Sequence, residues 1–517
     1  MHSVAHHSLD VAAVGSVLLE SFPAPAAVPP TAIAGLLALH DIGKFTRTFQ
    51  AKVEGLWPEA LGPYVQPPPG YPHDDAGFSL LCGSLAVHLD RLFAAWPTMA
   101  SRAPLLRAIA GHHGRPPREQ DHIGLPRKVA CPTCIAAAGD FIAEALLAIE
   151  PPPLPVLEKS QRTRLAWFLA GLAVAADWIG SAHSWFPPVV AADHADLVRY
   201  WRDVALPRAE RAVHASGVGS APVVPPSGIQ GIFPEISRPR PVQEWAQTTP
   251  IPEGPALFLI EDATGSGKTE AAIALAHRLM ATGRADGLFF ALPTMATANA
   301  MYDRLAGAYA RLFAGDERAS LVLAHGRRVL NARFTESILD AASEPASLPR
   351  EPADQPAGAQ CAAWIADDRR KAFLAEIGIG TVDQALLAVL PTRHAPLRLF
   401  GLSRRVLIID EAHAYDSYMF EELRRLLTFH AALGGSTIVL SATLTATQQS
   451  DLAAAFLNQP RPDLRARNEA PYPQATTVSA AEVHAVPCDI APELRRTVTI
   501  ERVENPEEAA GILAAAA

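Results

Sequence analysis

Cysteine is scarce in this 517-residue chain, and its five cysteines exclude a disulfide-rich secreted scaffold. One pair has the Cys-x-x-Cys spacing, Cys131-Pro-Thr-Cys134. A structural zinc site needs four ligands, and the sequence has no second pair with this spacing. We therefore interpret Cys131 and Cys134 as buried or incidental thiols rather than as half of a zinc site.

Positive charge is also in deficit. Lys and Arg number 44 against 53 Asp and Glu, and the formal net charge is -9. This balance excludes a globally basic nucleic-acid-binding protein. Any surface that binds nucleic acid must therefore be a local one.

Long hydrophobic runs are missing as well. The longest apolar stretch, Leu165 to Ala176, is shorter than the roughly 20 residues that cross a bilayer. Residues 1–20 lack the basic start of a signal peptide. We expect a buried helix over the apolar stretch and a cytoplasmic protein without membrane contact.

The composition that remains is that of a globular protein, with 49% hydrophobic and 19% charged residues, and the length allows about three domains at most. Up to about residue 200, apolar residues recur at helical spacing, around Val11 to Leu19, Ile33 to Leu39, Phe78 to Leu89 and Leu165 to Ala176. Proline-rich breaks separate these stretches. They predict an all-α domain over residues 1–214, followed by a Gly-, Pro- and Ser-rich linker over residues 215–241.

After residue 241, short apolar runs alternate with helical segments. The runs are Ala256 to Ile260, Gly287 to Leu292, Leu321 to Ala324, Val406 to Ile409 and Thr437 to Leu440. This alternation predicts an α/β domain with a mainly parallel sheet over residues 242–480. Residues 341–360 are predicted to form a surface loop. Residues 481–517 are expected to begin a connection to a further domain.

A phosphate-binding loop is predicted between the first of these runs and a helix. The segment Asp262-Ala-Thr264-Gly265-Ser266-Gly267-Lys268-Thr269 carries the Gly-Lys-Thr ending of such loops. The glycines let backbone N–H groups close around phosphate oxygens, and the helix N-terminus adds positive potential. Lys268 would reach the β- and γ-phosphates of ATP, and Thr269 would bind Mg²⁺.

A second motif, Asp410-Glu411-Ala-His413, follows the apolar run that ends at Ile409. A carboxylate at the carboxyl end of such a strand can hold Mg²⁺ beside the phosphate loop. We expect Asp410 in that role. Glu411 would polarise the attacking water, and His413 would couple this site to neighbouring motifs.

Histidine and aspartate gather in the helical half. These residues are the usual ligands of hydrolytic transition metals. The candidate ligands are His7, His40, Asp41, His73, His112, His113 and Asp177. Two ions on either side of a shared Asp41 would bind a scissile phosphate and activate water, and Lys44 would neutralise phosphate charge. His6 is an alternative to His7 as a metal ligand. An alternative role for Asp177 is that of a cap at a helix end.

Both sets of residues resemble known families. Ala38-Leu-His40-Asp41-Ile-Gly-Lys44, with the later histidines and Asp177, resembles HD phosphohydrolases, whose mixed sites accept iron, manganese, cobalt or nickel. The second half resembles superfamily 2 helicases. That resemblance implies DNA-gripping or coupling roles for Pro293, Thr294, Thr381, Asp383, Gln384, Ser441 and Thr443. It also implies a loose match of Gln243 to the residue that reads adenine.

An HD domain followed by a helicase core resembles the nuclease-helicase of type I CRISPR interference. The stretches Trp364-Ile-Ala-Asp-Asp-Arg-Arg-Lys-Ala-Phe-Leu-Ala and Asp410-Glu-Ala-His-Ala-Tyr-Asp-Ser-Tyr418 are closest to subtype E. The resemblance implies metal-dependent cleavage of single-stranded DNA by the HD domain, coupled to ATP-dependent 3′–5′ translocation and unwinding. It also implies recruitment by the Cascade surveillance complex to an R-loop, where the displaced strand is cut.

One departure from this family concerns the second RecA-like domain and its arginine finger, which have no counterpart motif here. We therefore expect an incomplete motor, with a separate polypeptide as one possible source of the missing domain. Two other functions stay open. HD domains also hydrolyse small nucleotides, and a truncated chain can act as a non-catalytic docking fragment.

Overall fold

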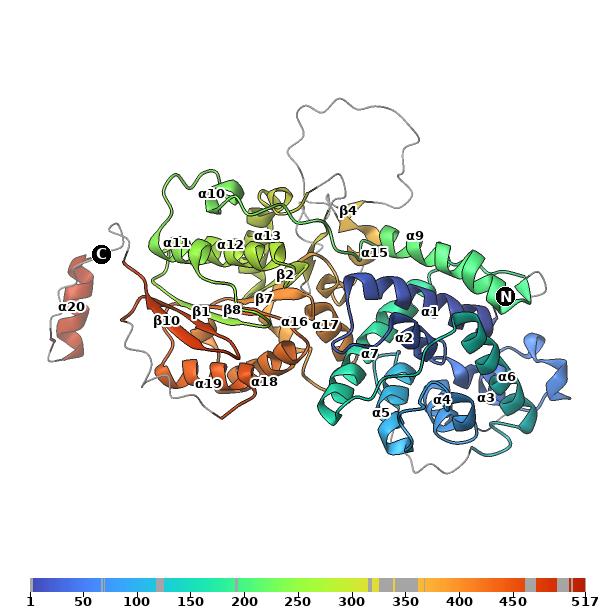
Figure 1. Ribbon diagram of the computed structural model, residues 1–517. Helices are drawn as coiled ribbons and strands as arrows, with labels where there is room; N and C mark the ends of the chain where they lie inside the picture. The colour runs from blue at the N-terminus through green and yellow to red at the C-terminus, as the bar shows by residue number, and fades with distance from the viewer. Residues whose placement is uncertain are drawn as a thin grey trace.

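The computed structural model folds into two parts that lie side by side (Figure 1). It describes residues 3–66, 68, 70–117, 125–190, 194–314, 319–324, 338–339, 361–366, 368–460, 471–490, 502–503 and 505–516. Helices drawn in blue to green form one part, and a sheet flanked by helices forms the other. The loop expected over residues 341–360 lies outside the described residues.

The helical part confirms the all-α prediction. Its main helices are α1 (Val4–Ser21), α2 (Pro30–Leu37), α3 (Arg47–Gln50), α4 (His73–Cys82), α5 (Met99–Ala110), α6 (Pro132–Ile149), α7 (Lys159–Gly180), α8 (Leu197–Tyr200) and α9 (Leu206–Ser216). Short 3-10 turns join them at Ile42–Phe45, Glu54–Leu56, Glu59–Leu61 and Ala86–Leu89, and a π turn at Trp201–Ala205 joins α8 to α9. The helix expected from Phe78 to Leu89 is interrupted, because α4 ends at Cys82 and Gly83 leaves the helical conformation.

Helix α7 is largely buried from Leu165 onward, as its apolar run predicts. Leu172, Val174 and Ala176 are completely buried. Of the described helices, α6 alone is long and apolar enough to cross a membrane. Since Ala138 and Ile142 of α6 are completely buried in the protein core, this is weak evidence for a span.

The second part is built on a sheet of mixed but mainly parallel strands, as predicted. Its strands are β1 (Leu257–Glu261), β2 (Gly287–Leu292), β3 (Leu321–Ala324), β6 (Ile377–Thr381), β7 (Arg405–Ile409), β8 (Thr437–Ser441), β9 (Gln474–Val478) and β10 (Val483–Pro487). Their order is β10-β9-β1-β8-β7-β2-β6-β3, and all pairs from β1 to β3 are parallel. A separate parallel pair joins β4 (Ile338–Leu339) to β5 (Cys361–Ala362).

Helices cover both faces of this sheet, which is why its parallel strands are buried along their whole length and mostly apolar. The helices are α10 (Ile229–Ile232), α11 (Pro241–Thr248), α12 (Lys268–Ala281), α13 (Met295–Ala306), α15 (Ala363–Ala366), α16 (Val382–Leu386), α17 (Ala395–Leu402), α18 (Ser417–Ala432) and α19 (Ala446–Leu457). In Figure 1, α11 to α13 lie on one face, and α18 and α19 lie on the other. A further helix, α20 (Pro506–Ala516), follows near the C-terminus.

Three described strands of the main sheet were missed by the sequence analysis. Strand β6 reads Ile-Gly-Ile-Gly-Thr, and glycine is unusual inside a strand. A Cβ at Gly378 would lie 2.5 Å from the Phe289 side chain, so glycine lets the neighbouring strand's aromatic ring pack closely. Strands β9 and β10 are antiparallel additions beside β1. Because β10 reaches Pro487, the boundary expected at residue 480 is too early.

The segment expected to be a linker is packed against the sheet part. Val224 N donates to Leu312 O (3.0 Å), and the buried ring of His277 lies 2.8 Å from Val224 O. Ile229 and Phe233 are buried. Residues 215–241 therefore belong structurally to the second part over much of their length.

Candidate metal centre and nucleotide-binding site

The candidate metal ligands come from five separate segments that meet in the helical part. His7 lies on α1, and His40-Asp41 follows α2. His73 begins α4, and His112-His113 follows α5. Asp177 lies in the last turn of α7. The packing of α1 and α5 against α7, of α2 against α1 and of α4 against α5 thus brings together residues that lie up to 170 positions apart.

Asp41 stands at the centre of the cluster and is completely buried. Its Oδ2 atom lies 3.2 Å from His7 Nε2 and 3.3 Å from His40 Nε2. Its Oδ1 atom lies 3.5 Å from His73 Nε2 and 3.5 Å from His112 Nε2. The two oxygens therefore face two different groups of histidines.

Asp177 completes the first group. Its Oδ1 atom lies 3.5 Å from His7 Nε2 and 3.7 Å from His40 Nε2. Ser181 Oγ donates to the same oxygen at 3.1 Å, which orients the carboxylate toward the histidines. Asp177 thus faces the other candidate ligands from the last turn of α7, and its role as a metal ligand stays a prediction.

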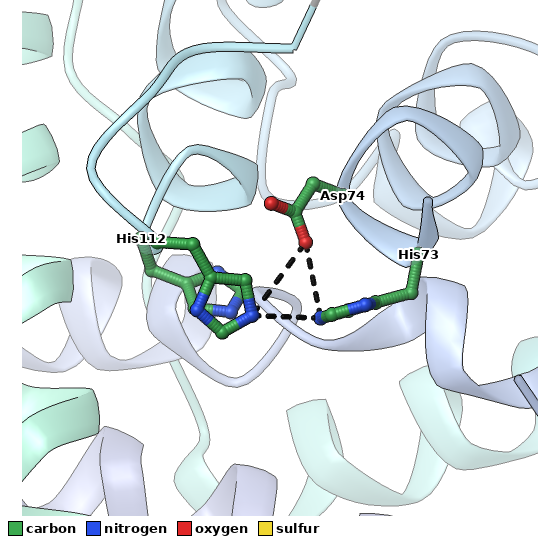
Figure 2. Close-up of side chains that lie close together, drawn as sticks. His73, Asp74 and His112 are labelled. Carbon is green, nitrogen blue, oxygen red and sulfur yellow. Dashed lines mark hydrogen bonds and ion pairs between the residues drawn. The ribbon is translucent and has the colours of Figure 1, made fainter. Parts of the chain in front are cut away.

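The second group contains a residue that the sequence analysis missed. Asp74 Oδ1 lies 3.0 Å from His73 Nε2 and 3.7 Å from His113 Nε2, and the two histidine Nε2 atoms are 3.0 Å apart. Figure 2 shows His73 and Asp74 on one helix facing the segment that carries His112. The signal was present in the sequence, because His73-Asp74 repeats the His-Asp pair of His40-Asp41.

The arrangement fits divalent metal ions. Buried atoms without a hydrogen-bond partner converge on the centre: His7 Nε2, His40 Nε2, His112 Nε2, Asp74 Oδ1 and both Asp41 carboxylate oxygens. Outer contacts orient two of the rings, because His40 Nδ1 lies 2.9 Å from Leu37 O and His112 Nδ1 lies 3.2 Å from Ile109 O. A proton on each Nδ1 leaves the Nε2 lone pair free for a metal.

The aspartates and histidines of the cluster shift one another's pKa values. Burial disfavours a charged His40 ring, but Asp41 and Asp177 outweigh burial and raise the pKa of His40 to about 9. Burial alone would raise the pKa of the Asp41 carboxyl, but His40, His7 and His112 hold that pKa well below its usual range. Asp41 is therefore an anion at neutral pH. Lys44 pairs with Asp41 Oδ2 from the edge of the cluster.

His6 and His7 point in different directions. His6 Nε2 lies 2.9 Å from His194 O, and the His6 ring packs edge-on against Tyr200 at 4.4 Å. His7 faces Asp41, so the geometry favours His7 over His6 as a candidate ligand, and this assignment stays a prediction. Cys131 and Cys134 are both buried, as expected, with their Sγ atoms 2.8 Å apart.

The phosphate-loop residues line a separate cavity of about 690 Å³ in the sheet part. The loop leaves β1 and enters α12, and Gly265 and Gly267 have positive φ angles of 81° and 91°. Glycine adopts these angles without strain. Thr264, Gly265, Gly267, Lys268 and Thr269 line the cavity, whereas Ser266 is buried beneath the loop.

Lys268 folds back across its own loop. Its ammonium group donates to Asp262 O (2.6 Å) and Ala263 O (2.9 Å). Burial lowers the pKa of Lys268, against the nearby carboxylates of Glu411, Asp262 and Asp410. A phosphate group would offer this ammonium group better charge compensation than the two carbonyls do.

Asp410 and Glu411 form the acidic wall of the same cavity. Asp410 follows β7, and its N–H donates to Ala291 O of β2 (3.0 Å). Burial, reinforced by the charge of Glu411, raises the pKa of Asp410 to about 6. A bound divalent cation would compensate the negative charges of both carboxylates and so would favour the ionised form of Asp410.

Other cavity residues include one weak prediction and two arginines that the sequence analysis missed. Gln243, on α11, lines the cavity and is almost fully buried, with its Nε2 atom 3.4 Å from Gly267 O. Arg240 donates to Gly265 O, and Arg304 pairs with Glu270. The two arginines come from separate segments, because Arg304 lies on α13 and Arg240 precedes α11. No local sequence motif therefore indicates them.

The remaining helicase-like motifs all lie at the carboxyl ends of parallel strands. Pro293 and Thr294 follow β2, and Thr294 caps α13. Thr381 ends β6, with Asp383 exposed and Gln384 buried on α16. Ser441 ends β8, and Thr443 follows it, exposed. The sheet therefore gathers these motifs along one edge.

One contact links two of these motifs directly. His413 Nδ1 lies 3.1 Å from Ser441 Oγ and 3.3 Å from Glu411 Oε2. Ser441 Oγ in turn donates to Thr443 O (3.1 Å). This geometry supports the predicted coupling role of His413, which stays a prediction.

Comparison with known proteins agrees with both halves of the molecule. Residues 1–186 match the family model described as the Cas3 HD domain. The chain is 33% identical over 485 residues to the CRISPR-associated endonuclease/helicase Cas3 of Escherichia coli (strain K12), covering 87% of this chain and 53% of that protein. The Cas3 of Thermus thermophilus is 31% identical, with coverage of 97% and 55%. This chain therefore spans about half the length of these curated relatives.

A solved structure supports the same assignment. The crystal structure of T. fusca Cas3-ATP is similar to this one with a TM-score of 0.77 and 27% identity, covering 95% of this chain and 56% of that one. The fold, the histidine–aspartate cluster and the phosphate loop agree with these similarities. The chain belongs to the Cas3 family of CRISPR-associated nuclease/helicases.

Proposed function

We propose that this chain cleaves single-stranded DNA at the metal centre of residues 1–214 and binds ATP with Mg²⁺ in the part that begins at residue 242. The observation that carries this proposal is the division of donors around Asp41. His7 and His40 lie toward Oδ2 and also face Asp177, whereas His73 and His112 lie toward Oδ1. Two metal-binding positions on either side of one carboxylate suit phosphodiester hydrolysis.

The residues of the chain have distinct roles in this reaction. Bound ions would polarise the scissile phosphate and activate water. Asp41 would bridge the two positions, and Asp177 and Asp74 would add one carboxylate to each. Lys44, at the edge of the cluster beside Asp41, would bind a non-bridging phosphate oxygen and so orient the substrate. The donor set suits iron, manganese, cobalt or nickel.

In the sheet part, Lys268 and the loop N–H groups would hold the β- and γ-phosphates of ATP. Thr269 and Asp410 would hold Mg²⁺, and Glu411 would polarise water. We further propose that nucleotide binding drives 3′–5′ movement along DNA through the motifs at the sheet edge. By its family, the chain would act in the cytoplasm in antiviral defence, recruited by the Cascade complex to the displaced strand of an R-loop.

Substitution of Asp41 tests the nuclease assignment. Asp41→Ala removes both bridging oxygens, so cleavage of single-stranded DNA should fall by well over 100-fold, since loss of outer contacts alone costs roughly 10- to 100-fold in such sites. The purified chain is loaded with each of the four metals, its metal content is measured, and strand cleavage is followed on gels. Asp140→Asn, an exposed carboxylate on α6, is the matched control.

Two outcomes would contradict this assignment. Normal cleavage by metal-loaded Asp41→Ala protein would show that the cluster is not the nuclease centre. Hydrolysis of deoxynucleoside triphosphates without cleavage of DNA would favour the alternative of a nucleotide phosphohydrolase.

A further inference from the structure

A second cavity, of about 710 Å³, opens beside the metal centre. His7 and Lys44 belong to both, so a molecule in this cavity lies next to any phosphate held by the metals. Gly180 and Ser181 add a wall from the end of α7, and Ser181 contacts Asp177. The volume falls within the range of small-ligand pockets, about 300–1,000 Å³, which a nucleoside fits.

Phe49 is the central feature of this cavity. Its ring meets the His73 ring edge-on, with centroids 5.4 Å apart. The preceding aromatic residue, Phe45, also lines the cavity, but its ring stacks on Phe141 at 5.4 Å and packs against the protein core. Phe49 is half-buried and lines the cavity next to a candidate metal ligand.

Two lysines accompany this ring. Lys44 Nζ lies 5.5 Å and Lys52 Nζ 4.4 Å from the centroid of Phe49. Both lysines also line the cavity. Cations alone would suit a phosphate, and an aromatic ring alone would suit any apolar group. The two together suit a nucleotide, whose base stacks on the ring while its phosphates meet the ammonium groups.

We propose that this cavity is a subsite for one unstacked nucleobase of the strand being cut, next to the scissile phosphate, with Phe49 as its stacking surface. The inference rests on the proposed function of the metal centre. A base in a duplex is covered on both faces by its neighbours, so only a single strand can offer a base to Phe49. The cavity would therefore contribute to the preference for single-stranded DNA.

The test combines a protein variant with a substrate that lacks one base. Phe49→Ala and the bulk-retaining Phe49→Leu are compared with the unaltered full chain, each loaded with metal, on a single-stranded oligonucleotide. A series of oligonucleotides carries one abasic nucleotide at each position around the cleaved bond. Loss of a base–aromatic stack weakens binding by about 5- to 150-fold, so both variants should raise KM by about 10-fold or more with a smaller effect on kcat.

The abasic series separates stacking from a structural role. At one position, loss of the base should raise KM for the unaltered chain by the same factor, and Phe49→Ala should then add nothing. Phe49→Trp should restore the KM on the intact strand. Tyr64→Ala is the control, because Tyr64 packs on Trp57 in the same region but does not line the cavity.

Other results would overturn the inference. Equal effects of Phe49→Ala on intact and abasic strands at every position would show that Phe49 only positions His73. Unchanged KM in both Phe49→Ala and Phe49→Leu would show that no base binds there. Failure of the proposed function would give a different result from failure of this inference, because the unaltered chain would then cleave neither the intact nor the abasic strand. That result would overturn both.

Discussion

At the residue scale, the two sites place buried carboxylates in opposite electrostatic settings. Histidines surround Asp41 and hold the pKa of its carboxyl well below the usual range, so Asp41 is charged before any ion arrives. Asp410 lies beside another carboxylate, and burial together with Glu411 raises its pKa to about 6. Asp41 is therefore ready to bind a cation at any physiological pH. Below about pH 6, Asp410 is protonated and must lose that proton before it can bind a cation.

This contrast predicts a pH dependence for nucleotide binding. Below about pH 6, Asp410 is protonated and cannot hold Mg²⁺, so affinity for Mg-ATP at limiting Mg²⁺ should fall. Between pH 7 and pH 5 the deprotonated fraction drops about 10-fold, and the apparent affinity should drop by a similar factor. Titration of a fluorescent ATP analogue at a series of pH values measures this change.

Asp410→Asn provides the control for that experiment. The variant should bind Mg-ATP weakly at every pH, and protonation of the nucleotide itself is common to both proteins. A fall in affinity of equal size in both proteins would show that Asp410 does not hold the cation.

At the element scale, helix α17 joins the sheet part to the metal centre. Arg393 Nε donates to His113 O (2.9 Å), and His394 N donates to Gly114 O (3.0 Å), just before α17 begins. The His394 ring lies edge-on to Trp178 at 5.1 Å, next to Asp177. The start of α17 therefore contacts the residues beside two candidate metal ligands.

Gly114 is the sensitive point of this contact. Its φ angle is 88°, and a Cβ there would lie 2.4 Å from His394 Nδ1. Gly114→Ala should therefore displace His113, lower metal affinity and nuclease activity by about 10- to 100-fold, and leave ATP affinity unchanged. Metal titration and strand cleavage measure the effect.

Gly254→Ala is the matched control, because Gly254 also has a positive φ of 90° but would place its Cβ in open space. In Gly254→Ala, the only effect should be the backbone strain of a side chain at a positive φ angle. Equal effects of both substitutions on metal affinity would show that the His394 contact does not position the ligand.

At the scale of the whole molecule, the two parts share an apolar interface but keep their chemistry apart. Rings of Phe22 and Phe168 pack on Phe400 of α17 at 4.7 and 5.1 Å. A Cβ on Gly171 of α7 would lie 2.3 Å from the Phe400 side chain, so the two helices pack closely. The candidate metal ligands all lie between residues 7 and 177, and the phosphate loop begins at residue 262.

The two activities should consequently be separable. Lys268→Ala should weaken ATP binding by at least about 10-fold, because it removes the cation at the phosphate loop. Metal-dependent nicking of single-stranded DNA without ATP should be unchanged. Lys128→Ala, which removes an exposed lysine, controls for the loss of charge. Unchanged ATP affinity in Lys268→Ala would refute the phosphate-loop assignment.

The sequence by itself determined the fold class, the family and most candidate site residues. The reason is that these signals are local. Helical and strand periodicity shows within a short window, and His40-Asp41 and Gly267-Lys268-Thr269 are recognisable from adjacent residues alone. The sequence analysis missed strand β6 because its two glycines break the strand pattern. The reason for glycine there is visible only in the structure, where the Phe289 side chain packs closely against both positions.

Only the tertiary structure decided which candidate ligands face the same oxygen of Asp41, that Asp74 joins them, and that Phe49 meets the His73 ring while Phe45 stacks on Phe141. It also placed the start of α17 against the metal centre and residues 215–241 against the sheet part. Each of these depends on how helices far apart in sequence rotate and pack against one another. That orientation results from the summed packing of the whole core, which no short stretch of sequence encodes.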